Sequence, residues 1–402
     1  MTHDISVCEA REAVLAAAHP LDAEEVGLAE ALGRVLAEGV RASFPIPPFD
    51  ASAMDGVAVR AEECAGVPVT LPLAGASWAG APFEGAMPPG SAVQIATGAV
   101  VPSEADAVVP VEWTDGLEGS HVRVHRQPAP GHAIRLAGSA VNAGADVATR
   151  GTRITPATIG ALATVGAARV SCVRQPVVRI VVTGDEVVPA GGALRRGQIH
   201  DANGPMLSAQ VREAGGIPEM VYAGDDKGAL ADVLRLGADV ILLTGGVSVG
   251  ARDRVRAEGC ALGVRWAFWR VRQRPGKPLL FGSYARVPVF GLPGNPVSAS
   301  VGFEVYVRPA LAAMQGAPEP PRRQPAQLAE DIPKPDGLHT FARVTAHRQP
   351  DGRLLLRPVR SQASHAVLSL LGDGLAHLPA DWREAPVGAE VSFEPFSWSR
   401  PC

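Results

Sequence analysis

Three short loops rich in glycine and polar side chains are the part of this sequence best suited to chemistry. Each follows an apolar run: Thr183–Glu186 after Val177–Val182, Thr244–Ser248 after Val240–Leu243, and Pro293–Ser298 after Val287–Phe290. Continuous Val, Ile and Leu runs are typical of parallel strands buried on both faces, and loops at the carboxyl ends of such strands meet in a crevice where ligands bind. Glycine lets the backbone approach a phosphate, and a helix N-terminus donates N–H groups to it. Acids among these loops therefore indicate a phosphate ligand bound together with a metal ion.

Each loop also has an ordinary structural explanation. Taken alone, Asp185 and Glu186 fit a polar turn better than a site. The adjacent glycines and the hydroxyls of Thr244 and Ser248 suit a backbone nest that holds phosphate oxygens, but a plain strand-to-helix connection explains them equally well. Asp253, three residues past Gly250, is by itself a typical acid at the start of a helix.

Positive charge gathers upstream of the third loop. Arg270, Arg272, Arg274 and Lys277 surround the segment Pro275–Pro278. A solvated basic face is the usual explanation of such a cluster. Here the prolines fix the backbone beside an acidic region, which favours recognition of an anion.

Three further segments combine rigid backbone with polar groups. Asn295 and Pro296 suit the cap and first residue of a helix, and the preceding Pro293-Gly294 offers a surface for an anion or a pterin-like ring. Pro48–Gly56 contains Asp55 among small residues, and Ala96–Ala99 places Thr97 in a glycine turn. Taken singly, the last two segments are more simply explained as turns.

Composition narrows the class of protein. The 402 residues contain 37 basic and 41 acidic side chains, a net charge of −4 that argues against nucleic acid or an anionic membrane as the main partner. Five dispersed cysteines lack CxxC spacing, so we expect neither a structural zinc site nor a disulfide framework. No basic-then-apolar signal segment and no apolar run of membrane-spanning length occur, and a cytoplasmic protein is expected. The histidines show no metal-ligand spacing. The sequence also contains no nucleophile-elbow, Walker or dinucleotide-binding motif.

The pattern of elements changes along the chain. Ser6 and Glu9 have capping-box spacing before a helix over Ala10–Ala18, and a second helical pattern covers Leu28–Glu38. Short β-like runs alternate with Gly and Pro over the next hundred residues, until Thr155-Pro156 begins another helix that would pack back on the first two. From residue 176 strands and helices alternate, which predicts a doubly wound α/β domain with helices over Gly204–Ala214, capped by Asn203, over Gly228–Leu236 and over Pro296–Met314. Short β runs return after a Pro/Arg-rich linker at 318–325.

Taken in order, these segments resemble the molybdopterin molybdenumtransferase family, of the bacterial MoeA and gephyrin E-domain type. Any one match is unspecific, but eight in the family's order and rough spacing are strongly specific. The matching segments are Pro48–Arg60, Ala96–Ala99, Thr183–Glu186, Gly197–Asn203, Thr244–Asp253, Pro275–Pro278, Pro293–Ser298 and Ser361–Leu370.

The resemblance implies an elongated four-part chain of α/β and β domains. We expect a helical N-terminal and linker domain (1–45 plus 142–172), an inserted β-rich domain (46–141), an α/β molybdopterin-binding domain (173–320) and a C-terminal β-barrel (321–402). It also implies a homodimer whose cleft joins the α/β domain of one subunit to the β-rich domain of the other. The reaction inserts molybdenum from molybdate into adenylylated molybdopterin and releases AMP, with Mg²⁺ as the cofactor. Transient partners would be the molybdopterin adenylyltransferase and the enzymes that receive the cofactor.

The resemblance assigns roles to individual positions. Catalytic roles fall on Asp55, Thr97, Glu186, Asp225 and Asp253, and the last three of these are the expected Mg²⁺ ligands. The expected substrate-binding residues are Asn203, Thr244, Gly245, Gly246, Ser248, Arg270, Arg274, Lys277, Pro293, Gly294, Asn295, Pro296, Ser298 and Ser364.

Two departures from the family pattern keep other functions open. Where the family has Arg-Arg-x-Gly-Glu-Asp, this chain has Arg135–Ala140, without either acid, and of an Arg-x-x-Phe-x-Arg pattern it keeps only Phe341 and Arg343. The alternatives are a divergent paralogue that carries molybdopterin without catalysis and an insertase that prefers tungstate. A third is the adenylyltransferase that makes the substrate, although such proteins are generally single α/β domains.

Overall fold

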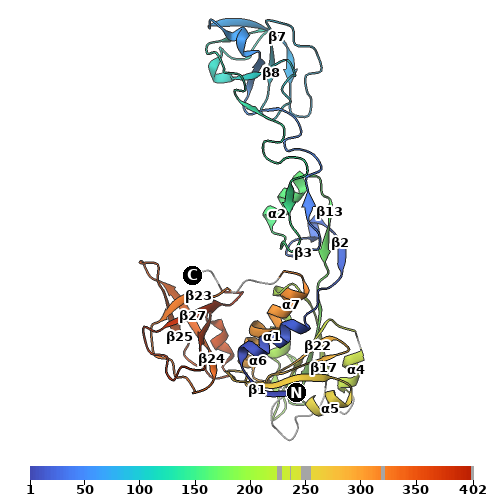
Figure 1. Cartoon of the computed structure of the whole chain (residues 1–402), viewed down its shortest axis with the longest axis vertical. Coiled ribbons are helices and arrows are strands. Elements are labelled where there is room, and N and C mark those ends of the chain that lie inside the picture. The colour runs from blue at the N-terminus through green and yellow to red at the C-terminus, as the bar shows by residue number, and fades with distance from the viewer. Residues whose placement is uncertain (224–228, 236, 246–254, 318–321, 400–402) are drawn as a thin grey trace.

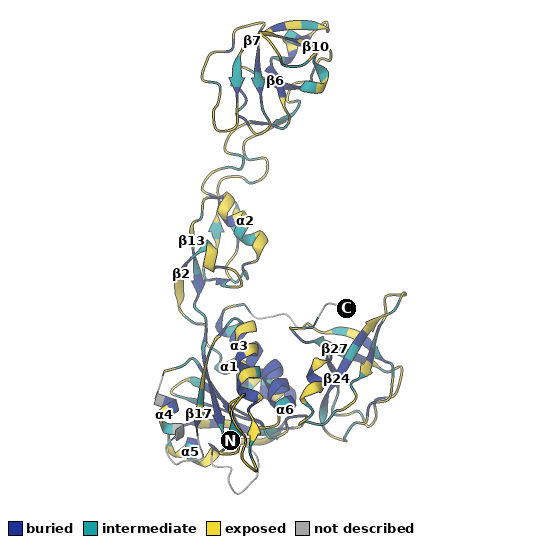
Figure 2. Ribbon diagram, turned by 180° about the vertical axis from the view of Figure 1, so that it is seen from behind, coloured by how far each residue is buried: buried dark blue, intermediate teal, exposed yellow. Residues whose placement is uncertain are grey.

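The computed structural model describes residues 1–223, 229–235, 237–245, 255–317 and 322–399. The chain is elongated, with a β-rich part at one end, a slender linker in the middle, and an α/β part and a barrel side by side at the other end (Figure 1). Buried segments concentrate in the sheets and in the helices around α1 and α6, whereas the linker is largely exposed (Figure 2). The elongated four-part architecture expected from the sequence is confirmed.

A seven-stranded sheet organises the α/β part. Four parallel strands form one side of it in the order β17, β14, β18, β22, followed by the antiparallel β21, then β19, with β1 at the other edge. Their bounds are β17 Ile217–Ala223, β14 Val177–Thr183, β18 Val240–Thr244, β22 Val287–Leu292, β21 Leu280–Tyr284, β19 Arg265–Val271 and β1 Thr2–Ile5.

Helices cover both faces of this sheet, which confirms the doubly wound α/β domain. One face packs against α1 (Val7–Ala17), α3 (Asn203–Glu213) and the continuous helical stretch α6 (Pro296–Gly302), a π-helical turn (Phe303–Val307) and α7 (Arg308–Met314). The other face packs against α4 (Ala229–Arg235) and α5 (Val255–Ala261). The expected capping box is present, because the Ser6 hydroxyl accepts from the Glu9 N–H and the Glu9 carboxylate accepts from the Ser6 N–H.

The distal β-rich part contains a five-stranded sheet with a hydrophobic cluster on each face. Its strands, in sheet order, are β10 (His121–Val124), β7 (Val69–Ser77), β8 (Ala92–Ile95), β6 (Gly56–Val59) and β9 (Ala107–Pro110). A separate two-stranded sheet pairs β5 (Ala51–Ser52) with β11 (Ile134–Arg135).

The linker corrects two expectations. It is a three-stranded sheet of β2 (Ala23–Gly27), β13 (Arg169–Val173) and β3 (Val35–Leu36), flanked by α2 (Pro156–Thr164) and by β4 (Val40–Arg41) paired with β12 (Asp146–Ala148). The helix expected over Leu28–Glu38 is wrong. Only the single 3₁₀ turn Leu28–Glu30 is helical, because Gly33 adopts a φ of +77° and Val35–Leu36 pairs with β13.

The second correction concerns α1, which does not pack with α2. The apolar face of α1 (Val7, Ala10 and Val14) lies in the core of the α/β part, against α7 and β19. Residues 2–17 therefore belong structurally with the α/β part and not with 142–172. The other domain bounds expected from the sequence stay predictions.

The C-terminal part is a closed five-stranded barrel. Its order is β24 (His339–Arg348), β25 (Leu354–Pro358), β23 (Gln324–Leu328), β27 (Glu390–Pro395) and β26 (Gly374–Leu378), and β26 pairs back with β24. A short strand of the α/β part, β20 (Gln273–Arg274), pairs with β24 and so attaches the barrel directly after the basic segment. Among the described residues, every helix is too short or too polar to cross a membrane.

Candidate functional site

The three glycine loops meet at the carboxyl edge of the parallel strands, as the sequence predicts. They line a cavity of about 410 Å³ that lies past the ends of β14, β18 and β22 and beside the start of α3. The predicted site residues that line it are Glu186, Asn203, Thr244, Gly245, Pro293, Gly294 and Asn295.

Glu186 is held at this edge by a tight turn after β14. Gly184 has a φ of +119°, a backbone conformation in which any other residue would be strained, so glycine is required. The Val187 N–H donates to the Gly184 carbonyl (3.1 Å), and the Ile199 N–H donates to the Glu186 carbonyl (2.9 Å). The short pair β15 (Val187–Val188) and β16 (Ile199–His200) thus fixes the backbone of Glu186 and leaves its side chain exposed beside the cavity.

Asn203 ties the loops together and is not the helix cap that the sequence suggests. Its Nδ2 donates to Thr244 Oγ1 (2.7 Å) and to the Gly294 carbonyl (2.8 Å), while the first turn of α3 is closed by Asp201 Oδ1, which accepts from the Gly204 N–H (3.0 Å). Asn203 is buried, and its Oδ1 has no hydrogen-bond partner among the residues that the structure describes. A buried amide oxygen beside a cavity favours a ligand that donates a proton to it.

Replacing Asn203 with alanine is expected to lower the free energy of unfolding by about 1–3 kcal/mol, because Thr244 and Gly294 lose a shared buried donor. Chemical denaturation of both proteins measures this loss. The exposed Arg212→Ala change on the same helix is the control and should cost less than about 0.5 kcal/mol. Equal stability of the Asn203→Ala variant and the parent would show that these two hydrogen bonds do not stabilise the fold.

A second cavity, of about 270 Å³, continues the first toward the barrel and shares Pro278, Pro293 and Asn295 with it. The barrel contributes Ser364, whose hydroxyl accepts from Asn295 Nδ2 (3.0 Å) and whose carbonyl accepts from the Val297 N–H (3.1 Å). The other predicted residues that line this cavity are Arg274, Lys277 and Ser298.

Two predicted substrate residues lie outside the linings of both cavities. The guanidinium of Arg270 stacks on the Trp269 ring, with its Cζ 4.2 Å from the ring centre. Pro296 is the first residue of α6 and serves as the N1 proline of that helix. Gly246, Ser248, Asp225 and Asp253 lie outside the described residues.

Arg343 is a candidate site residue that the sequence reasoning did not include. It is 1 % exposed; its Nε donates to Ser369 Oγ (3.3 Å), and its backbone N–H donates to Gln362 Oε1 (3.0 Å). Burial, and to a lesser degree the neighbouring charge of Arg274, lowers the pKa of Arg343 to about 10. Within the described ranges it has no carboxylate partner, and it meets the second cavity only through Gln362, whose side chain lines that cavity. The only sequence signal was its place in the incomplete family motif.

Asp55 and Thr97 form a pair at the opposite end of the molecule. The Thr97 N–H and hydroxyl both donate to Asp55 Oδ1, at 2.7 and 3.0 Å, and these bonds, the backbone one first, lower the pKa of the Asp55 carboxyl. Both residues lie in the distal β-rich part, while Glu186 lies in the α/β part (Figure 1). One chain therefore does not bring Asp55 to Glu186.

Replacing Thr97 with valine should raise the pKa of Asp55, but not to its ordinary value, because the backbone N–H remains as a donor. A lowered carboxyl pKa stabilises the fold above the unfolded pKa, and this contribution disappears as the pH falls through the folded pKa. A carbon-detected NMR titration of the Asp55 carboxyl measures the change. An identical titration curve in the variant would show that the hydroxyl has no effect.

Comparison with known proteins agrees with this arrangement along the whole chain. Residues 5–166 match the MoeA N-terminal region (domain I and II), residues 179–313 a probable molybdopterin binding domain, and residues 325–396 the MoeA C-terminal region (domain IV). The fold and the site define a protein with a molybdopterin-binding type of α/β domain set between an inserted β-rich part and a barrel.

Individual relatives show to which family the chain belongs. A molybdopterin molybdenumtransferase 2 of Mycobacterium tuberculosis is 38% identical over 381 residues (91% of this chain, 93% of the relative), and the molybdopterin molybdenumtransferase of Haemophilus influenzae is 34% identical over 388 residues (94% and 95%). A crystal structure of the MoeA protein of Pyrococcus horikoshii superposes with a TM-score of 0.81 at 30% identity, covering 98% of this chain and 100% of the other. The chain belongs to the MoeA family of molybdopterin molybdenumtransferases, as the sequence motifs predicted.

Proposed function

We propose that this protein inserts molybdenum from molybdate into adenylylated molybdopterin and releases AMP, as a step of molybdenum cofactor biosynthesis. The observation that carries the proposal is one groove with opposite charges at its two ends. Two adjoining cavities of about 410 and 270 Å³ share lining residues, with Glu186 in the first and Arg274 and Lys277 in the second. The relatives are named molybdopterin molybdenumtransferases, which supports a transfer of molybdenum.

The basic end suits the anionic part of the substrate. Arg274 and Lys277 line the second cavity, and the buried Arg343 donates its backbone N–H to the lining residue Gln362. Cleavage of the phosphoanhydride that joins molybdopterin to AMP builds negative charge on the phosphate oxygens, and fixed cations neutralise that charge at little cost in reorganisation. Pro293, Gly294 and the start of α6 supply a rigid backbone beside it.

The acidic end fits a divalent cation. Mg²⁺ is commonly held by one or two carboxylates together with substrate phosphate oxygens, and Glu186 presents an exposed carboxylate at the first cavity. Substrate phosphate oxygens would complete the coordination of an ion held by so few carboxylates. Bound Mg²⁺ would polarise the phosphoryl oxygens. Glu186 would hold it, together with Asp225 and Asp253 as the family resemblance implies.

We infer that the working unit is a homodimer. Asp55 and Thr97 are expected catalytic residues, yet in one chain they lie at the far end from Glu186 (Figure 1). A two-fold partner could bring its β-rich part to the groove and complete the site. A cytoplasmic location, and transient contact with the adenylyltransferase and with recipient molybdoenzymes, belong to the same proposal.

A second candidate follows from the segment Arg135–Ala140, which lacks the two acids of the family motif. The Ala137 N–H donates to Asp50 Oδ1 (2.8 Å) and the Gly138 N–H donates to the Pro47 carbonyl (3.0 Å), so this loop packs against the segment leading to Asp55 without them. The missing acids could alter oxyanion handling. A tungstate-preferring insertase or a non-catalytic carrier is therefore the alternative.

A turnover assay on adenylylated molybdopterin separates these candidates. We expect AMP release that requires Mg²⁺ and molybdate. Faster release with tungstate, measured in parallel, would select the tungstate enzyme. Tight molybdopterin binding without AMP release under either oxyanion would overturn the insertase assignment in favour of the carrier.

A further inference from the structure

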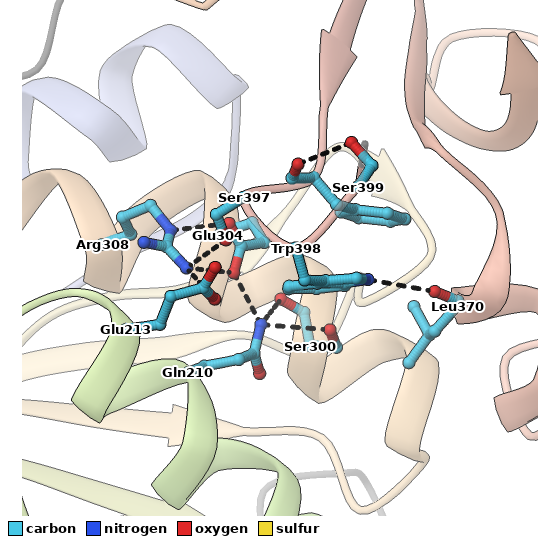
Figure 3. Close-up of polar contacts among 10 residues, drawn as sticks. Gln210, Glu213, Ser300, Glu304, Arg308, Leu370, Ser397, Trp398 and Ser399 are labelled. Carbon is cyan, nitrogen blue, oxygen red and sulfur yellow. Dashed lines mark hydrogen bonds and ion pairs between the residues drawn. The ribbon is translucent and has the colours of Figure 1, made fainter. Parts of the chain in front are cut away.

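A buried network of charged and polar side chains lies between the α/β part and the barrel (Figure 3). Arg308 Nε donates to Glu304 Oε2 (2.7 Å), and Arg308 Nη2 contacts Glu304 Oε1 (3.1 Å) and Glu213 Oε2 (3.3 Å). Gln210 Nε2 donates to Glu304 Oε1 (2.7 Å) and to Ser300 Oγ (3.2 Å). Glu304 and Arg308 are 8 % and 6 % exposed, so neither charge can be left without the other at low cost.

The network joins the two helices that begin in the candidate site. Gln210 lies about two turns along α3 from Asn203, and Ser300 lies in α6, which begins directly after Asn295. The helical stretch continues through a π-helical turn that contains Glu304. The network therefore joins α3 and α6 to each other beyond the ends that border the candidate site.

The same network holds the end of the barrel chain. Ser397 Oγ accepts from Arg308 Nη2 (2.7 Å), and the next residue, Trp398, donates from its Nε1 to the Leu370 carbonyl (3.4 Å). The Trp398 ring stacks on Phe396 with centres 4.5 Å apart. Leu370 lies in the 3₁₀ helix Val367–Leu371, a few residues after Ser364, the barrel residue that contacts Asn295 in the groove.

Besides the pairing of β20 with β24 and a hydrophobic cluster that both parts share, the described residues hold the barrel to the α/β part by polar contacts at two places. One, Asn295–Ser364, lies in the groove itself. The other, Arg308–Ser397, lies away from the groove, among residues that line neither cavity. Rotation of the barrel about the groove contact would change the width of the second cavity, and the Arg308 contact opposes such rotation.

We propose that Arg308 is a positioning residue, which through Ser397 sets the orientation of the barrel and so the width of the cavity between Arg274 and Ser364. The proposal rests on the proposed function, because the cavity is taken to hold the substrate's anionic part. Arg308 acts through other residues and touches no reacting atom.

A set of serine variants tests this assignment without disturbing the buried charges. Ser397→Ala removes the hydroxyl that accepts from Arg308, and Ser397→Thr restores it. Ser399→Ala is the matched control, since among the described residues Ser399 Oγ donates to the Phe396 carbonyl and not to the α/β part. We expect Ser397→Ala to raise KM for adenylylated molybdopterin roughly three- to tenfold at unchanged kcat, as for loss of one charge-assisted hydrogen bond. Ser397→Thr should return KM toward the parent value, and Ser399→Ala should leave it unchanged.

A distance measurement tests the role of Arg308 in orienting the barrel, independently of catalysis. Spin labels are attached through Arg212→Cys (α3) and Arg357→Cys (β25), two exposed positions, in a protein with Cys8, Cys260 and Cys402 replaced by serine. The distance between the labels, measured by double electron–electron resonance, reports the orientation of the barrel relative to the α/β part. The distance distribution should broaden with Ser397→Ala and stay narrow with Ser399→Ala. An unchanged distribution with Ser397→Ala, or equal broadening in both variants, would overturn the proposal. Absent turnover by the parent protein would instead count against the proposed function, and the distance result would still judge Arg308.

Discussion

Replacing Glu186 with glutamine is expected to lower the rate of AMP release by about 10²–10³-fold, the size found when one group that stabilises transition-state charge is removed. Glutamine keeps the shape of the side chain but loses the negative charge that would hold Mg²⁺. Glu186 is exposed beside the cavity and its backbone is held by the Gly184 turn, so the fold should not change. Single-turnover AMP release, with thermal unfolding of the same sample, measures both effects.

The control for this experiment is Glu12→Gln. Glu12 is an exposed carboxylate of α1 in the same part of the molecule, and it lines neither cavity. Its variant should release AMP at the parent rate. Normal turnover by the Glu186→Gln protein at saturating Mg²⁺ would refute the role given to Glu186.

Asp55→Asn is expected to have the second large effect, a loss of about 10²-fold or more in AMP release. Asparagine keeps an oxygen that can accept from the Thr97 N–H and hydroxyl, so the turn should persist while the charge is lost. Since Asp55 is exposed, unfolding temperature should stay within a few degrees of the parent, as for surface substitutions. Steady-state AMP release and calorimetry test this.

Glu62→Gln, an exposed glutamate of the same β-rich part, is the matched control and should leave the rate unchanged. If Asp55→Asn also leaves the rate unchanged, the distal part does not contribute to the site. The homodimer proposal would then lose its functional reason.

Local sequence signals predicted the elements whose cause is local. The strands β14, β18 and β22 follow from uninterrupted apolar runs, and α1 follows from the Ser6–Glu9 capping box. The helix expected over Leu28–Glu38 failed because pairing of Val35–Leu36 with β13, far along the chain, outweighs local helical preference.

In the candidate site, too, features with a local cause were predicted and features that depend on long-range contacts were not. Glycine turns marked Thr244 and Gly294, and the structure places both in the cavity. The sequence predicted Asn203 as a helix cap as well as a substrate-binding residue, and the capping prediction is wrong because its acceptors lie 41 and 91 residues away. Arg343 and Arg308 gave no local signal of their contacts, because burial of a charge depends on partners that only the folded chain assembles.

The central claim is that carboxylates from two subunits complete one substrate-binding groove, and mixing two inactive variants tests this claim most directly. Asp55→Asn and Glu186→Gln proteins, unfolded or dissociated together and reassembled in equal amounts, should regain about a quarter of the parent AMP-release rate, since half of the dimers would carry one intact site of two. Each variant reassembled alone should stay inactive. Failure of the mixture to regain activity, with mixed dimers shown to form by native mass spectrometry, would contradict a site shared between subunits.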